Sequence, residues 1–158
     1  MKKLFTLILT LCLGITGVNA TNLPADVLNS AVTPKSIGKT ICVVGYTGTI
    51  RPSTYYTNKI KTNLMKQAGL DVSHIADYEL DHNVPLALGG NATNVSNLKL
   101  QSRTGADDAG NKDVLERKLQ CLVCSKQVPL RVAQKDIYTE WHKAASKYSS
   151  MSCKRPTK

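Results

Sequence analysis

Three stretches of the chain repeat apolar residues at the spacing of an amphipathic helix. The first begins after Ser53, which can cap it, and runs to about residue 68, where Gly69 ends it. The second covers about 109 to 122 after Asp107 or Asp108, and the third runs from Pro129 to about 147. These patterns predict three helices with the apolar stripes Tyr56, Ile60 and Leu64; Leu115, Leu119 and Leu122; and Leu130, Ala133, Ile137 and Trp141.

Strand signals occur between the proposed helices and before them. Residues 37–50 are rich in β-branched side chains broken by Gly45 and Gly48, which predicts one strand or two with a bend. Residues 78–82 predict a short strand, after which Pro85 and two glycines turn the chain into a loop. Residues 21–36 have the composition of an exposed lead-in with a short helix. We therefore expect a small α+β domain stabilised by disulfides.

The first 20 residues have the composition of a secretory signal peptide. Lys2 and Lys3 precede an apolar run from residue 4 to 15, and Ala20 completes a small-residue cleavage site. The run is too short to favour stable insertion in a membrane, and Cys12 within it would be removed by cleavage. We expect residues 1–20 to direct export, to the periplasm or the medium, and residues 21–158 to form one domain.

The chain is basic, with 21 Lys plus Arg against 11 Asp plus Glu and a formal net charge of +10. Removing Lys2 and Lys3 from the 21 basic residues leaves 19 against 11, or +8. Such a charge attracts polyanions, of which nucleic acid is the commonest, although basic exported proteins also owe their charge to solubility alone.

Four cysteines follow the signal peptide, an even number that suggests two disulfides in an oxidising compartment. Cys121 and Cys124 lie one turn apart in a predicted helix, a poor geometry for bonding to each other. Of the three connectivities we favour Cys42 with Cys124 and Cys121 with Cys153. A redox pair or half of a zinc site at Cys121 and Cys124 stays open as an alternative.

The densest chemistry lies between residues 78 and 100. Asp81 can hold a hard cation, and the adjacent His82 points the other way on an extended strand, where it can take a proton from water. Asn97 closes the loop that follows. An acid and a base that flank one phosphate suit metal-assisted hydrolysis of a phosphodiester.

The run Asp81-His82-x-x-Pro85-Leu86-x-Leu88-Gly89-Gly90 followed by Asn97-Leu98 resembles the HNH, or ββα-metal, endonuclease motif. Flanking segments resemble a secreted bacterial branch of that family: 40–52, Lys112-Asp113-x-x-Glu116, Val123-Cys124 and Ala133-Gln134-x-x-Ile137-x-x-x-Trp141. The resemblance implies two strands and a helix around one divalent ion, with a motif core at about 77–124. It also implies that His82 is the general base, that Asp81 is a metal ligand, and that Asn97 orients the histidine or reaches the ion.

The family's helix histidine has no counterpart, because no histidine lies between His82 and His142. The resemblance then leaves its place to Asn111, Asp113 or Glu116. In the alternative interpretation, the acids of this helix pair with Lys112 and Arg117 or interact with its positive end. Oxygen ligands favour Mg²⁺ first, then Mn²⁺ or Ca²⁺, over Zn²⁺.

Lys112, Arg51 and Arg117 are the candidate contacts to nucleic acid, with Lys112 neutralising a phosphate oxygen as a point charge. His74 and His142 have no acid at short range in the sequence and are interpreted as surface or structural histidines. We interpret Tyr55 and Tyr56 as packing residues and the lysines at 59, 61 and 66 as a solvated face. Contact of these residues with nucleic acid is the alternative interpretation.

The predicted function is that of an exported, metal-dependent endonuclease that cuts double-stranded DNA, with RNA left open, without strong sequence specificity. The alternatives are a degenerate HNH fold that binds nucleic acid or another envelope partner without cutting, and a structural protein of the cell envelope. Export and disulfides weaken the need for an immunity or inhibitor protein.

Overall fold

The computed structural model describes residues 23–153, so the predicted signal peptide lies outside the described residues. Its main helices and strands are α1 (Tyr46–Ile50), α2 (Thr54–Gln67), β1 (Tyr78–His82), β2 (Leu98–Ser102), α3 (Ala109–Cys124) and α4 (Leu130–Tyr148). Short 3₁₀ turns join them at Ala25–Val27, Ile37–Lys39, Val72–Asp77, Leu86–Leu88 and Val95–Asn97. Within the described range no helix is long and apolar enough to cross a membrane. The fold is α+β, as expected.

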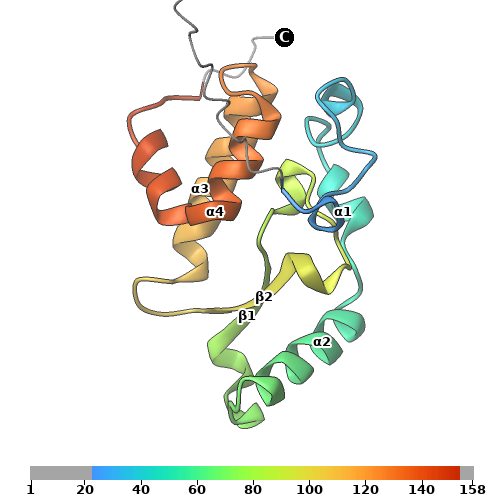
Figure 1. Ribbon diagram of the computed structural model, residues 1–158, viewed down its shortest axis with the longest axis vertical. Helices are drawn as coiled ribbons and strands as arrows, with labels where there is room; N and C mark the ends of the chain where they lie inside the picture. Colours follow the sequence, from blue (N-terminus) through green and yellow to red (C-terminus); the bar gives the residue numbers. More distant parts are fainter. Residues whose placement is uncertain (1–22, 154–158) are drawn as a thin grey trace, which may run out of the picture.

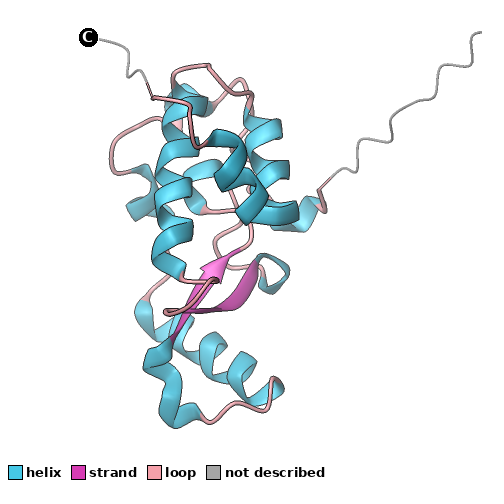
Figure 2. Ribbon diagram, turned by 90° about the vertical axis from the view of Figure 1, so that its left-hand side faces the viewer, coloured by secondary structure: helices cyan, strands magenta, loops and turns pink. Residues whose placement is uncertain are grey.

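The two strands pair antiparallel and form the centre of the molecule (Figures 1 and 2). Leu80 lies opposite Leu100, and His82 lies opposite Leu98. Helix α2 packs against the strands at one end, while α3 and α4 form the bulk of the other end. This arrangement leaves the end of β1, where the candidate residues lie, at the junction of the two parts.

The main core joins α3 and α4 to the N-terminal segment and to the loop after β1. Its buried side chains include Leu119 and Leu122 of α3, Ile137 and Trp141 of α4, and Val84, Leu88, Val27, Val32 and Ile41. The lead-in prediction for 21–36 was therefore wrong in part, because Val27 and Val32 are buried in this core. Leu28 also forms a β-bridge to Gly90, which fastens the N-terminal segment to the loop.

The strand prediction for residues 37–50 was wrong: the described segment contains only a 3₁₀ turn and α1. A strand needs a partner, and this segment satisfies its backbone locally instead, as when the Cys42 and Val43 N–H groups donate to Ile37 and Thr40. Gly45 adopts a left-handed conformation, with φ of 85°, that turns the chain into α1. Ile41 is buried while Val44 is fully exposed, so β-branched composition does not report pairing here.

The helix predictions were confirmed together with their start signals. The Ser53 hydroxyl accepts from the Tyr56 N–H, and the Asp108 carboxylate accepts from the Gly110 N–H at 2.6 Å. Pro129 directly precedes α4. In α2, however, Met65 is buried while Tyr55 and Tyr56 are both exposed, so the packing interpretation is wrong for these two tyrosines.

Both favoured disulfides are present, Cys42 with Cys124 and Cys121 with Cys153. They fasten the segment before α1 and the chain after α4 to the C-terminal end of α3. Two disulfides are typical of proteins in an oxidising compartment, either extracellular or periplasmic.

The two remaining histidines are at the surface, but each has an acid partner. His74 Nδ1 lies 3.0 Å from Asp77, and His142 lies 3.2 Å from Glu140 and 3.3 Å from Asp107. The expectation that they lack acids was wrong because Asp77 and Glu140 lie within three residues of the two histidines and because the fold brings Asp107, just before α3, to His142 on α4.

Candidate functional site

The loop between β1 and β2 is built around the side chain of Asn97. Its amide nitrogen donates to the Val84 and Asn91 carbonyls at 2.9 Å each, and its oxygen accepts from the Val84 N–H at 2.8 Å. A side chain at Gly90 would overlap the Val84 carbonyl and this amide, so glycine is required there. Asn97 is fully buried and therefore holds the loop together through the backbone instead of pointing its amide at a ligand.

This loop fixes the ring of His82. Its Nε2 lies 3.2 Å from the Ala92 carbonyl oxygen, one residue along from the Asn91 carbonyl that Asn97 holds. Because a carbonyl can only accept, Nε2 carries the proton and Nδ1 is the basic nitrogen of the neutral ring. Burial lowers the pKa of His82 below its usual value, assisted by the positive charge of Arg51 and opposed by the Ala92 contact and Asp81.

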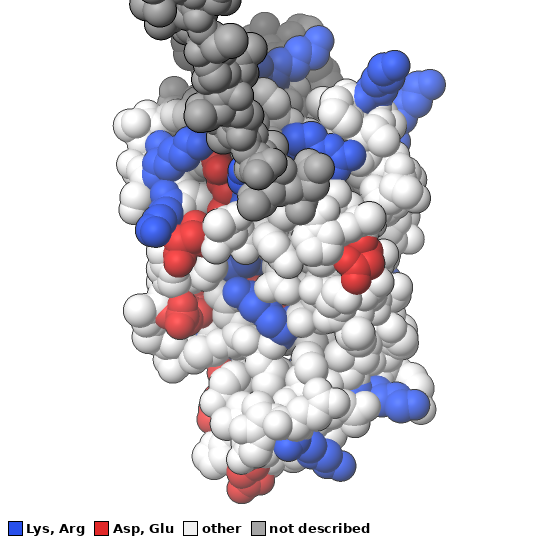
Figure 3. All heavy atoms as spheres, in the orientation of Figure 1, with Lys and Arg blue, Asp and Glu red and all other residues white. Residues whose placement is uncertain are grey.

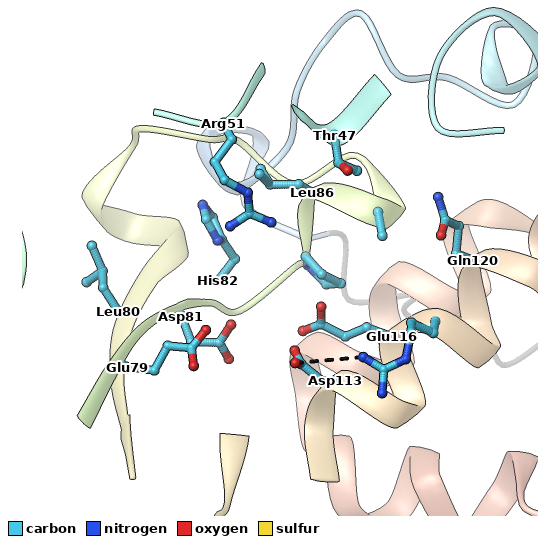
Figure 4. A pocket seen from close by; sticks show the side chains of 13 residues that line it. Thr47, Arg51, Glu79, Leu80, Asp81, His82, Leu86, Asp113, Glu116 and Gln120 are labelled. Atoms are coloured by element: carbon cyan, nitrogen blue, oxygen red, sulfur yellow. Dashed lines mark ion pairs between the residues drawn. The ribbon is translucent and has the colours of Figure 1, made fainter. Parts of the chain in front are cut away.

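A pocket of about 260 Å³ opens between β1, the loop, α1 and α3, and we call it the acidic pocket. Figure 4 shows Glu79 and Asp81 entering it from β1 and Asp113 and Glu116 from α3. His82 and Arg51 lie together on one side of it. The acids therefore meet the candidate base in one space, although β1 and α3 are distant in the sequence.

Lys112 lies behind the pocket and connects two of its acids, Asp81 and Glu116. Its ammonium nitrogen lies 2.8 Å from Asp81 Oδ2 and 2.5 Å from Glu116 Oε1, and it donates to the His82 carbonyl at 2.9 Å. The side chain is 1% exposed and its ammonium faces these three oxygens inside the protein, so the predicted contact of Lys112 with a phosphate was wrong. The pairing of Lys112 with Glu116 was the alternative interpretation of this helix, and it is the one observed.

The electrostatics of this cluster are dominated by burial. Burial raises the pKa of Glu116 to about 7, against the attraction of Lys112. Burial alone would lower the pKa of Lys112, but Glu116 and Asp81 together raise it above its usual value. The ammonium is therefore always charged near neutral pH and holds β1 and α3 at a fixed separation.

The other predicted residues divide between the pocket and the surface. Asp113 lines the acidic pocket but is half exposed and pairs with Arg117 at 3.8 Å. Asn111 is exposed and is not among the residues that line it. Arg51 and Arg117 line the pocket, and their contact with nucleic acid stays a prediction.

The carboxylates fit a hydrated hard cation such as Mg²⁺. Asp81 and Glu116, when ionised, set two negative charges against the single charge of Lys112. The buried Asp81 Oδ2 atom forms the ion pair with Lys112 but accepts no well-aligned hydrogen bond from the described residues. One or two carboxylates suffice for Mg²⁺, which keeps water and takes substrate oxygens. Within residues 23–153, no group of three or more His, Cys, Asp or Glu side chains could hold a metal ion.

A second pocket of about 240 Å³ adjoins the first, and we call it the basic pocket. It shares Arg51, Glu79, Leu80 and His82 with the acidic pocket and adds Lys61 of α2 and Arg103 after β2. Sequence reasoning assigned Lys61 to a solvated face and did not single out Arg103. Lys61 and Arg103 lie 42 positions apart, so the sequence shows the charge of each residue but not that the two share a pocket.

Comparison of the chain with protein-family models, with curated proteins and with solved structures found no match.

Proposed function

We propose that this protein is a metal-dependent endonuclease that hydrolyses phosphodiester bonds in nucleic acid. The observation that carries the proposal is the fixed His82 ring, whose Nε2 proton is held by the Ala92 carbonyl and whose side chain lines a pocket together with four acids. The order of Asp81, His82 and the glycine loop, which resembles the HNH motif, supports the same reaction.

In this mechanism, His82 Nδ1 takes a proton from a water molecule as its oxygen attacks phosphorus and the bond to the leaving 3′ oxygen breaks. Arg51 provides positive charge beside the ring for a non-bridging phosphate oxygen. Asp81 and Glu116 would hold the divalent cation, which when bound would stabilise charge on the phosphate and on the leaving oxygen. Lys112 keeps both carboxylates in position and does not contact the substrate.

A second function, binding of nucleic acid without cleavage, is favoured by one observation. The Lys112 ammonium already lies between the two acids, where it supplies part of the charge that a metal would supply. Turnover that requires metal separates the two functions.

The test is a plasmid-nicking assay of the oxidised protein with Mg²⁺, Mn²⁺, Ca²⁺, Zn²⁺ or EDTA. We expect nicking with Mg²⁺ and none with EDTA. His82→Ala should lower the rate by roughly 10²- to 10⁴-fold while DNA binding and the melting temperature stay close to those of the parent. Intact plasmid under every condition, with folded protein that still binds DNA in a salt-sensitive way, would select binding without cleavage.

A further inference from the structure

The basic pocket contains two cations, Lys61 and Arg103, that the proposed chemistry does not use. Its described lining includes three cations, Arg51, Lys61 and Arg103, against one acid, Glu79. The acidic pocket has the opposite balance, with four acids in its lining. Figure 3 shows Lys and Arg side chains dispersed over one face of the molecule with Asp and Glu among them.

The cations of the basic pocket come from three separate elements. Arg51 follows α1, Lys61 lies on α2, and Arg103 follows β2. Partial burial, and after it the neighbouring Arg103, lowers the pKa of Lys61; the second cause agrees with two cations held close together. Glu79 lies 3.3 Å from Arg103 and offsets only one of the three charges. The described lining of the basic pocket therefore carries two more positive charges than negative charges, which favours binding of an anion.

The two pockets meet along one wall. His82, Arg51, Leu80 and Glu79 line both, so a ligand that reaches the histidine from the acidic pocket continues directly into the basic one. Thr54, Thr57 and Asn58 of α2 add polar side chains to the second space. A single phosphodiester offers one phosphate, whereas a nucleic-acid strand presents a further phosphate to the adjoining pocket.

We propose that the basic pocket is a phosphate subsite, in which Lys61, Arg103 and Arg51 bind a phosphate flanking the bond that is cut. This inference rests on the proposed function, since the cutting site defines what is flanking. The substrate is therefore a polynucleotide strand that spans both pockets, and its recognition is through the backbone, without reading of bases.

The experiment compares two substrates that differ in the flanking phosphate. The oxidised protein and Lys61→Met/Arg103→Met are assayed with Mg²⁺ on bis(p-nitrophenyl) phosphate, which has one phosphate, and on a 12-nucleotide strand. We expect kcat/KM on the strand to fall roughly tenfold or more, through KM, while kcat/KM on the one-phosphate substrate is unchanged. Lys59→Met/Lys66→Met is the matched control: it removes two exposed positive charges from α2 that do not line the pocket, and should change both reactions little.

Equal losses on both substrates, no loss on either, or the same loss in the control would overturn the subsite. If the parent protein cleaves neither substrate, the proposed function fails, and the subsite is judged by binding alone. In that case the slope of log K against log salt for the strand should be shallower by about 1 to 2 in Lys61→Met/Arg103→Met than in the control variant. Equal slopes would then overturn it.

Discussion

The acidic and basic pockets share His82 and Arg51, yet their charges lie at different depths. Behind the acidic pocket the Lys112 side chain is 1% exposed, and its ammonium nitrogen lies 2.8 Å from Asp81 and 2.5 Å from Glu116, whose side chains are 14% and 15% exposed. In the basic pocket the Arg103 and Glu79 side chains are 52% and 36% exposed and lie 3.3 Å apart.

This difference separates residues that fix geometry from residues that can meet a ligand. A buried ion cluster has already lost its water, so breaking it leaves an uncompensated charge inside the protein. An exposed pair keeps most of its water and contributes little to folding, so it can exchange its partner for a phosphate at small cost. The depth of a charge thus predicts whether its removal affects stability or binding.

The largest expected effect is on stability at Lys112. Lys112→Met should lower the free energy of unfolding by about 3–5 kcal/mol, because Asp81 and Glu116 lose their shared cation in a buried site. Lys61→Met should change it by no more than about 0.5 kcal/mol. Urea denaturation of the oxidised proteins measures both. Adding Glu116→Gln to Lys112→Met should restore part of the loss; equal small losses at both lysines would contradict the comparison.

The next effect is on the pH dependence of cleavage. Burial lowers the pKa of His82 below its usual 6.5, so the neutral ring is the main form at pH 6.5 and the acid limb of the rate should have its midpoint below that pH. Below the lowered pKa, the protonated ring cannot accept a proton, and kcat/KM should fall about tenfold per pH unit. Arg51→Met removes a positive charge and should move this limb toward higher pH. A limb above pH 6.5 in the parent protein would mean that His82 is not the buried base.

A smaller effect concerns the stability of the acidic pocket against pH. The pKa of Glu116 is raised by burial from 4.5 to about 7, so the folded protein binds more protons than the unfolded chain between these values. Stability from this group is therefore full below pH 4.5 and is lost as pH rises through 7. In EDTA, the melting temperature should fall between pH 5 and pH 8, and less so in Glu116→Gln. An equal fall in both proteins would mean that a group other than Glu116 causes the loss of stability.

Local signals were enough to predict much of the fold. Ser53, Asp108 and Pro129 mark helix starts that depend only on neighbouring residues, and these were correct. The strand at 78–82 and the disulfide pairing were also correct. Residues 37–50 failed because β-branched side chains favour a strand only where a partner strand exists, and none pairs with this described segment.

The site needed long-range information that the chain does not display. The spacing of Lys112 and Glu116 on one helix face offered their pairing as an alternative, but Asp81 comes from a strand 31 positions earlier in the sequence. The sequence places Asn97 at the end of the loop after His82, but its hydrogen bonds to the Val84 and Asn91 backbone depend on how that loop folds. The tertiary fold alone brings Lys61 to Arg103.

The smallest effect tests the acid that lines both pockets. Glu79→Gln should change the free energy of unfolding by no more than about 0.5 kcal/mol, because its pair with Arg103 is exposed. It should tighten binding of a DNA duplex by roughly twofold to fivefold at low salt, since Glu79 both repels phosphate and occupies Arg103, and the gain should shrink as salt screens it. Fluorescence anisotropy in the His82→Ala background, at low and high salt, measures this without cleavage. Weaker binding would instead mean that Glu79 orients Arg103 for its ligand, and the exposed pair would then belong with the residues that fix geometry.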